Sequence, residues 1–287
     1  MPHCVVQAAE DLLDKEFRVL DKGFVRLVDY LGGDARIVQA ARVSYGEGTK
    51  SFREDAALID HLLRNEHTSP FEQVILSFHV KLPIFVARQW IRHRTARVNE
   101  ISGRYSIMKD EFYLPAAENI AGQSLADRQG RAAEPVPEDE ARSYIARMEA
   151  TQRAAYAEYA SLVDAGLARE LARIDLPLSL YTEWYWQIDL HNLFRFLMLR
   201  LDPHAQLEIR EYAAALLEIA RAVAPSATTS FENHVLGGTR FSAEEMAELR
   251  RRLASAGAHE GADVKQSGLQ GKRLERFEKK LQTGRQL

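Results

Sequence analysis

Two short segments of alternating apolar residues, far apart in the chain, most constrain the fold. Within residues 73–81, every second side chain from Val74 to Val80 is apolar, which is typical of a half-buried strand. Residues 178–188 are aromatic and alternate in the same way. The segments around them have helical rather than strand patterns. The sequence therefore predicts only a few strands, which are separated along the chain by helices. This arrangement favours an α+β fold over a repeating β-α-β sheet.

The remaining patterned segments are mostly helical. Pro83 suits the first turn of a helix, Gly166 ends a long one, Pro203 separates two more, and Pro225 marks a stop. We therefore expect helices at 83–93, 138–165, 190–201 and 205–224, a loop at 99–104, extended structure at 105–114 and a polar loop at 122–139.

Charge is unevenly distributed between the two ends of the chain. The formal net charge is -3, but residues 250–287 contain ten Lys or Arg and four Asp or Glu, which leaves a net charge of -9 for residues 1–249. The tail is also poor in large apolar residues. We therefore expect one domain over residues 1–249 and a basic, solvated C-terminal extension over 250–287, helical in part around 272–281.

Several classes of protein are disfavoured. No segment approaches the ~20 uninterrupted apolar residues that span a bilayer, and the N-terminus turns acidic too early for a signal peptide, so we expect no membrane partner and a cytoplasmic location. The single cysteine, Cys4, excludes an intrachain disulfide and any cysteine-built metal site. The histidines lack ligand spacing, so no metal is expected. Dinucleotide, P-loop and nucleophile-elbow motifs are absent.

The densest polar segment, residues 88–106, contains five arginines. Arg88 and Arg92 are four residues apart and would share a helix face. A guanidinium donates paired hydrogen bonds to phosphate or carboxylate, and the turn at Gly103 would add backbone N–H donors. The alternative is a solvated helix end paired with Glu100. Two further arginines, Arg173 and Arg200, border apolar segments. Each either binds an anion, or extends its charged end to solvent or pairs with a carboxylate.

Together these segments resemble the flavin-dependent thymidylate synthases. Arg92-His93-Arg94, followed by seven residues and Ser102, matches the signature of that family. Four ordered blocks resemble the family's other segments: residues 67–72, 99–106, 173–181 and 199–206. The resemblance implies an α+β fold with helices packed around a small, mainly antiparallel sheet, and a single catalytic domain over residues 1–249.

The resemblance also implies an activity. Members methylate dUMP to dTMP with methylenetetrahydrofolate as carbon donor and NADPH-reduced FAD as hydride donor. They are homotetramers whose active sites are shared between subunits. The monophosphate, pyrophosphate and folate carboxylates all suit an arginine-rich cleft without a metal. Cys4, near the N-terminus, is poorly placed to act as the thiolate used by the classical thymidylate synthases.

Residue roles follow from the matching positions, as the resemblance implies. Arg200 would be catalytic and would stabilise the uracil anion at N3. His204 would lie close to the flavin. The residues expected to bind dUMP are Gln89, Trp90, Ile91, Arg92, Glu100, Ile101, Ser102, Gly103, Arg104, Arg173 and Arg200. The residues expected to bind FAD are Ser69, Glu72, Arg92, His93, Arg94, Asp189, Leu190, His191 and Arg195.

Some positions depart from the letters common in the family. Gln73 and Arg97 replace a histidine and a serine, and the flavin-facing positions 189, 191 and 195 also differ. Residues 122–139 and the basic tail have no counterpart in the resemblance. Two other classes stay open: a phosphate-binding enzyme of different chemistry, and an RNA-binding protein using residues 88–104 and the tail. The acidic charge of residues 1–249 and the lack of aromatic residues among the arginines disfavour nucleic acid as a partner.

Overall fold

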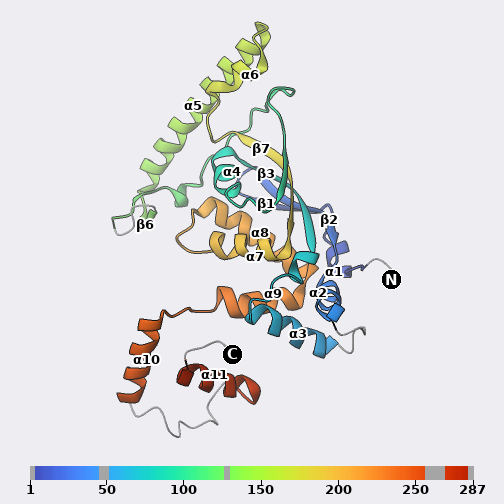
Figure 1. Ribbon diagram of the computed structural model, residues 1–287. Helices are drawn as coiled ribbons and strands as arrows, with labels where there is room; N and C mark the ends of the chain where they lie inside the picture. Colours follow the sequence, from blue (N-terminus) through green and yellow to red (C-terminus); the bar gives the residue numbers. More distant parts are fainter. Residues whose placement is uncertain (1–3, 45–51, 126–129, 256–268, 284–287) are drawn as a thin grey trace.

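A single antiparallel sheet forms the centre of the computed structural model, which describes residues 4–44, 52–125, 130–255 and 269–283. Its strands are β1 (Glu16–Val19), β2 (Gly23–Leu31), β3 (Ile75–Pro83), β7 (Tyr181–Asp189) and β4 (Arg97–Glu100), in the order β1-β2-β3-β7-β4. Every neighbouring pair is antiparallel. Helices pack against the sheet (Figure 1), so the expected α+β fold with a mainly antiparallel sheet is confirmed.

The two strands expected from alternation pair at the centre of the sheet. β3 and β7 run side by side from Ile75 opposite Asp189 to Pro83 opposite Tyr181. Alternate side chains of both strands, such as Phe78 and Trp186, are buried on one face of the sheet and stack there. The other face carries mostly half-buried and exposed residues, as alternation in a one-sided sheet predicts.

Three helices cover the buried face. These are α4 (Ile84–Trp90), α7 (Leu190–Arg200) and α8 (Leu207–Val223). The fully buried Trp90 of α4 contacts the rings of Trp186, Phe196 of α7 and Tyr212 of α8. This aromatic cluster fixes α4 and α7 relative to each other and to the sheet.

A long helix, α5 (Glu138–Asp164), runs along one side of the molecule and leads to the short helix α6 (Arg169–Ala172), as Figure 1 shows. Gly166, with a φ of 85°, turns the chain after α5 as expected. Tyr159 of α5 is buried, and its hydroxyl accepts a hydrogen bond from Met108 N at 3.0 Å. These contacts hold α5 against residues that follow β4.

The remaining elements lie around this core. They are α1 (Gln7–Glu10), α2 (Asp34–Ala41), α3 (Phe52–Arg64), α9 (Pro225–Phe231), α10 (Ala243–Ser255), α11 (Lys272–Thr283), and the paired strands β5 (Ala121–Gln123) and β6 (Arg131–Pro135). No helix among the described residues is long and apolar enough to cross a membrane.

Three local predictions were wrong, and a fourth was incomplete. The polar segment 122–139 contains the β5–β6 pair and the start of α5 rather than a loop alone. The expected loop at 99–104 begins inside β4, because its residues pair with β7. Helix α4 ends at Trp90, so Arg92 lies in the turn beyond it. Pro225 not only stops α8 but also begins α9.

Candidate active site

The first group of predicted site residues lies where α4 meets the end of α7. Helix α4 ends because the chain turns after Trp90, whose carbonyl accepts a hydrogen bond from His93 N at 3.0 Å. Arg200 is the last residue of α7. Its Nε donates to His93 Nε2 at 3.0 Å, and one of its terminal nitrogens donates to the Gln89 carbonyl at 3.0 Å. We call Gln89, His93 and Arg200 the helix-end cluster.

The electrostatics of this cluster keep His93 neutral. Burial, together with the positive charges of Arg200 and Arg195, lowers the pKa of His93 to about 4. A neutral imidazole can accept the Arg200 hydrogen bond, whereas an imidazolium could not. Burial also lowers the pKa of Arg200, although an arginine stays charged at neutral pH.

The Arg200 guanidinium retains an uncompensated positive charge. Both of its hydrogen-bond acceptors are neutral, and no carboxylate in the described part of the chain lies within ion-pair distance of it. A partly buried guanidinium held by neutral groups is well suited to an anionic ligand or to negative charge that develops during a reaction.

The second group lies after β4. The backbone N–H groups of Tyr105 and Ser106 both donate to the Ser102 carbonyl, which makes a tight turn around Gly103. A Cβ at Gly103 would lie 3.0 Å from Cδ of Arg173 and 3.1 Å from a neighbouring methionine sulfur, so glycine permits the close approach of this arginine. We call residues 102–104 and Arg173 the loop cluster.

Arg104 of the loop cluster is exposed and has one acidic partner. Its Nε donates to Glu170 of α6 at 2.9 Å, and its guanidinium lies 6.0 Å from the centre of the Tyr105 ring. An exposed ion pair of this kind is weak, typically ~0.2–1 kcal/mol. A phosphate could therefore replace Glu170 at little cost.

The two clusters are separate in this chain. Figure 1 shows α6, which precedes Arg173, beside the far end of α5, with α4 and the sheet lying between it and α7. No hydrogen bond, ion pair or ring contact between described residues joins the helix-end cluster to the loop cluster. One copy of the chain therefore presents two separate arginine clusters.

The residues expected at the flavin gather along α7. The segment Ser69–Glu72 lies beside this helix, where Phe71 and Phe194 are 6.5 Å apart between ring centres. His191 and Arg195 lie one turn apart on α7, Ser69 and Glu72 are exposed, and Arg92 and Arg94 are exposed beyond α4. None of these three arginines has a carboxylate partner among the described residues.

Other predicted residues have side chains already engaged in the fold. Asp189 caps α7 by accepting from the backbone and side chain of Asn192 at 2.9 and 2.8 Å. The side chains of Trp90 and Leu190 are fully buried, and Leu190 N donates to the Val74 carbonyl at 2.8 Å. Glu100 accepts a hydrogen bond from Thr182 at 2.7 Å. Ile91 and Ile101 are partly exposed apolar residues.

His204 was expected near the flavin. It lies in an exposed turn, where its backbone N and its Nδ1 both contact Asp202 Oδ1, at 2.8 and 2.9 Å. These contacts fix the turn between α7 and α8. They give His204 a local structural role in this chain.

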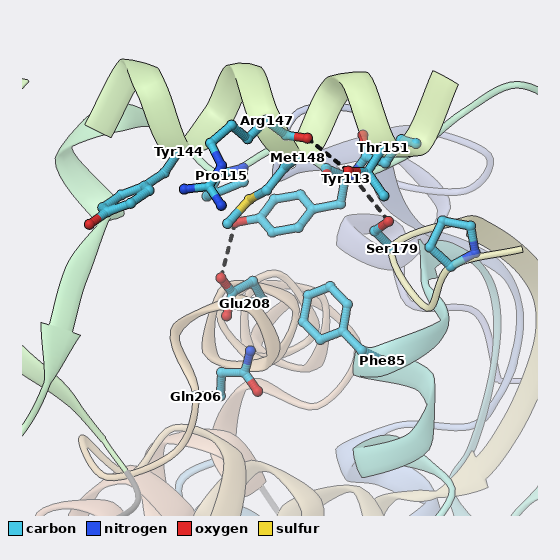
Figure 2. A pocket seen from close by; sticks show the side chains of 12 residues that line it. Phe85, Tyr113, Pro115, Tyr144, Arg147, Met148, Thr151, Ser179, Gln206 and Glu208 are labelled. Carbon is cyan, nitrogen blue, oxygen red and sulfur yellow. Dashed lines mark hydrogen bonds between the residues drawn. The ribbon is translucent and has the colours of Figure 1, made fainter. Parts of the chain in front are cut away.

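A cavity that the sequence did not predict lies beside the helix-end cluster. It has a volume of about 760 Å³ and is walled by Phe85 of α4, Tyr113 and the inner side of α5, as Figure 2 shows. Gln206 at its edge contacts the side chain of Gln89. The carboxylate of Glu208 accepts from Tyr113 at 3.0 Å. Its walls come from segments with no shared motif, so no sequence signal marked them.

Acidic and sulfur ligands do not gather anywhere in the described residues. No group of three or more His, Cys, Asp or Glu side chains there could hold a metal ion. The positively charged clusters are instead suited to phosphates and other anions.

Comparison with known proteins adds the family context. The family model described as thymidylate synthase complementing protein matches residues 26–226, and the model described as thymidylate synthase ThyX C-terminal domain matches residues 239–287. The basic tail, expected to have no counterpart, therefore does have one.

Relatives and solved structures agree with these models. A flavin-dependent thymidylate synthase of Treponema denticola is 64% identical over 275 residues, covering 96% of this chain and 100% of the relative. One of Thermus thermophilus is 57% identical over 256 residues, covering 89% and 92%. The crystal structure of a UMP/dUMP methylase from Streptomyces cacaoi bound to 5-Br dUMP is 30% identical, with a TM-score of 0.69, and covers 76% of this chain and 98% of that one.

Proposed function

The chain belongs to the flavin-dependent thymidylate synthases, and we propose that its helix-end and loop clusters are the two halves of the dUMP site. As a member of this family it is an FAD-dependent enzyme that methylates dUMP to dTMP. This membership sets aside both alternatives, an enzyme of other phosphate chemistry and an RNA-binding protein. The observation that supports the residue assignment is the Arg200 guanidinium, which is held by neutral groups and has no carboxylate partner among the described residues.

The loop cluster would bind the phosphate of dUMP. Arg104 and Arg173 provide guanidinium donors, and the turn at Gly103 brings Arg173 close to the backbone. Charge-assisted and bidentate hydrogen bonds of this kind are the strongest that a phosphate receives from side chains. Ser102 and Glu100 would contact the rest of the nucleotide, together with Gln89, Arg92 and the backbone of residues 90, 91 and 101.

Arg200 would act on the base. Its guanidinium is held by His93 and the Gln89 carbonyl and has no carboxylate partner among the described residues. A donor fixed before the reaction stabilises charge that develops in it without a reorganisation cost. We propose that Arg200 stabilises negative charge at N3 of uracil, which makes C5 more nucleophilic. No cysteine thiolate takes part.

The residues along α7 suit FAD. The exposed guanidinium groups of Arg92, Arg94 and Arg195, with Ser69 and His191, match the charge and hydrogen-bonding needs of its pyrophosphate. Glu72, His93, Asp189 and Leu190 would complete the site. When bound and reduced by NADPH, FAD supplies the hydride for the methyl group.

Further proposals concern the assembly and the other substrate. We propose a homotetramer in which the loop cluster of one subunit meets the helix-end cluster of another, because one chain leaves the two apart. Methylenetetrahydrofolate is the proposed carbon donor.

We propose residues 1–249 as the catalytic domain and 250–287 as an extension, although α10 crosses that boundary. A cytoplasmic location is proposed because dUMP and NADPH are charged and do not cross bilayers readily.

The variant Arg200→Ala tests the assignment. We expect thymidylate formation to be lost while NADPH oxidation through FAD is at least partly retained, since Arg200 acts on uracil. The matched control is Arg251→Ala, which removes an exposed arginine of α10. Wild-type-like thymidylate formation in Arg200→Ala would remove Arg200 from the mechanism. A purified protein that shows no flavin absorption and cannot be reconstituted with FAD would contradict the cofactor site.

A further inference from the structure

A second positively charged cavity lies away from both arginine clusters, where α3, α9 and α11 meet. Its volume is about 960 Å³. Figure 1 shows these helices at the opposite end of the molecule from α6. The charged and polar residues that line it include Asp60, His61, Arg64, Ser230, Arg273 and Arg276.

The positive charges in this cavity exceed the negative charge. The Arg64 side chain is only 12% exposed and pairs with Asp60 at 3.0 Å. The same carboxylate also contacts His234 Nε2 at 2.7 Å and is therefore shared. In the described part of the chain, no carboxylate lies within ion-pair distance of Arg273 or Arg276. Three guanidinium groups thus share one lining carboxylate.

The arginines are close enough to repel one another. Burial and the charges of Arg276 and Arg273 lower the pKa of Arg64, against the opposing effect of Asp60. Arg273 and Arg276 lie one turn apart on α11 and both line the cavity opposite α3. Like charges held around a partly enclosed space favour binding of an anion that neutralises them.

The rest of the lining suits a phosphorylated ligand. Hydroxyl and amide groups of Ser226, Thr229 and Asn233 supply further donors, and Ala57 and Pro225 form an apolar part of the wall. We propose that this cavity binds a small polyphosphate anion, which bridges α11 to α3 and α9. The inference is independent of the proposed dUMP site, because none of the residues involved belongs to either cluster.

Calorimetric titration of the holoenzyme tests the proposal. Inorganic tripolyphosphate and, in a second arm, ATP are titrated into enzyme already saturated with FAD and dUMP, so that the catalytic arginines are occupied. We expect Arg276→Gln to weaken binding at least tenfold, or about 1.4 kcal/mol. Lys272→Gln removes a charge from the same helix outside the cavity and should bind as the wild type does.

Hydrogen exchange of the α11 amides provides a second measurement. Tripolyphosphate should slow exchange over residues 272–283 at least tenfold in the wild type and much less in Arg276→Gln. Equal affinities for both ligands would identify the phosphates alone as the determinant, whereas tighter binding of ATP would identify a nucleotide. Absence of binding in both arms, or equal binding by wild type and Arg276→Gln, would overturn the proposal.

Discussion

Acidification should destabilise this enzyme through His93. The folded protein holds the pKa of this histidine at about 4, because of burial and the nearby charges of Arg200 and Arg195, against an ordinary value of 6.5. A histidine whose pKa is lowered by folding stabilises the fold in its neutral form. That contribution is complete above about pH 6.5 and is lost as the pH falls toward 4.

The magnitude follows from the same two values. The difference between 6.5 and about 4 corresponds to at most about 3 kcal/mol per subunit. Because the imidazole is partly exposed, solvent screens part of this interaction, and we expect about 1–2 kcal/mol. The structural cause is specific, since a protonated Nε2 would face the donating Nε of Arg200 at 3.0 Å.

The assay compares wild type with His93→Gln in urea unfolding of the holoenzyme, at one protein concentration, at pH 7.5 and pH 4.5. Glutamine retains an oxygen acceptor for Arg200 but does not titrate. The wild type should lose about 1–2 kcal/mol more stability than the variant between the two pH values. His204→Gln is the control, because His204 is exposed and its side chain contacts Asp202 rather than this arginine. Parallel pH dependences of wild type and His93→Gln would refute the reasoning.

Two further predictions concern an exposed and a buried ion pair. Arg104→Ala should weaken dUMP binding by about 1.5–3 kcal/mol, the value of a charged hydrogen bond, and an unchanged dissociation constant would reject the phosphate role of this residue beside Glu170. Arg131→Met should cost about 1.5–3 kcal/mol in the free energy of unfolding at pH 7, because it leaves the buried carboxylate of Glu208 without its guanidinium. Burial opposes ionisation of Glu208, but Arg131 holds its pKa below the usual value, so this cost should shrink near pH 4 as the carboxylate is protonated. Arg142→Met, which removes an exposed pair on α5, should change stability little, and an equal loss in both variants would contradict this account.

The centre of the fold was predictable because its signals are local. β3 and β7 each show alternation within their own residues, and α5 shows helical spacing with a glycine at its end. By contrast, β4 has four exposed residues and no apolar pattern. It forms a strand because β7 offers a free edge, which is a property of the tertiary structure. β1 and β2 lie within the first 66 residues, for which no element was predicted.

The candidate site was predictable in its residues but not in its geometry. Recognisable motifs contain Arg104, Arg173 and Arg200. The separation of the loop cluster from the helix-end cluster, however, depends on the tertiary position of α6 at the far end of α5. The engagement of Asp189 in capping α7 also depends on local geometry that its identity alone does not specify. The cavity beside Gln206 was missed because its walls come from several distant segments.

The separation of the two arginine clusters has a genetic consequence. In the proposed assembly, a subunit with Arg104→Ala retains an intact helix-end cluster, and one with Arg200→Ala retains an intact loop cluster. Two inactive alleles of this enzyme expressed in one cell would then complement each other, since about one site in four of a random mixed assembly would contain two intact halves. Two alleles that damage the same cluster would not.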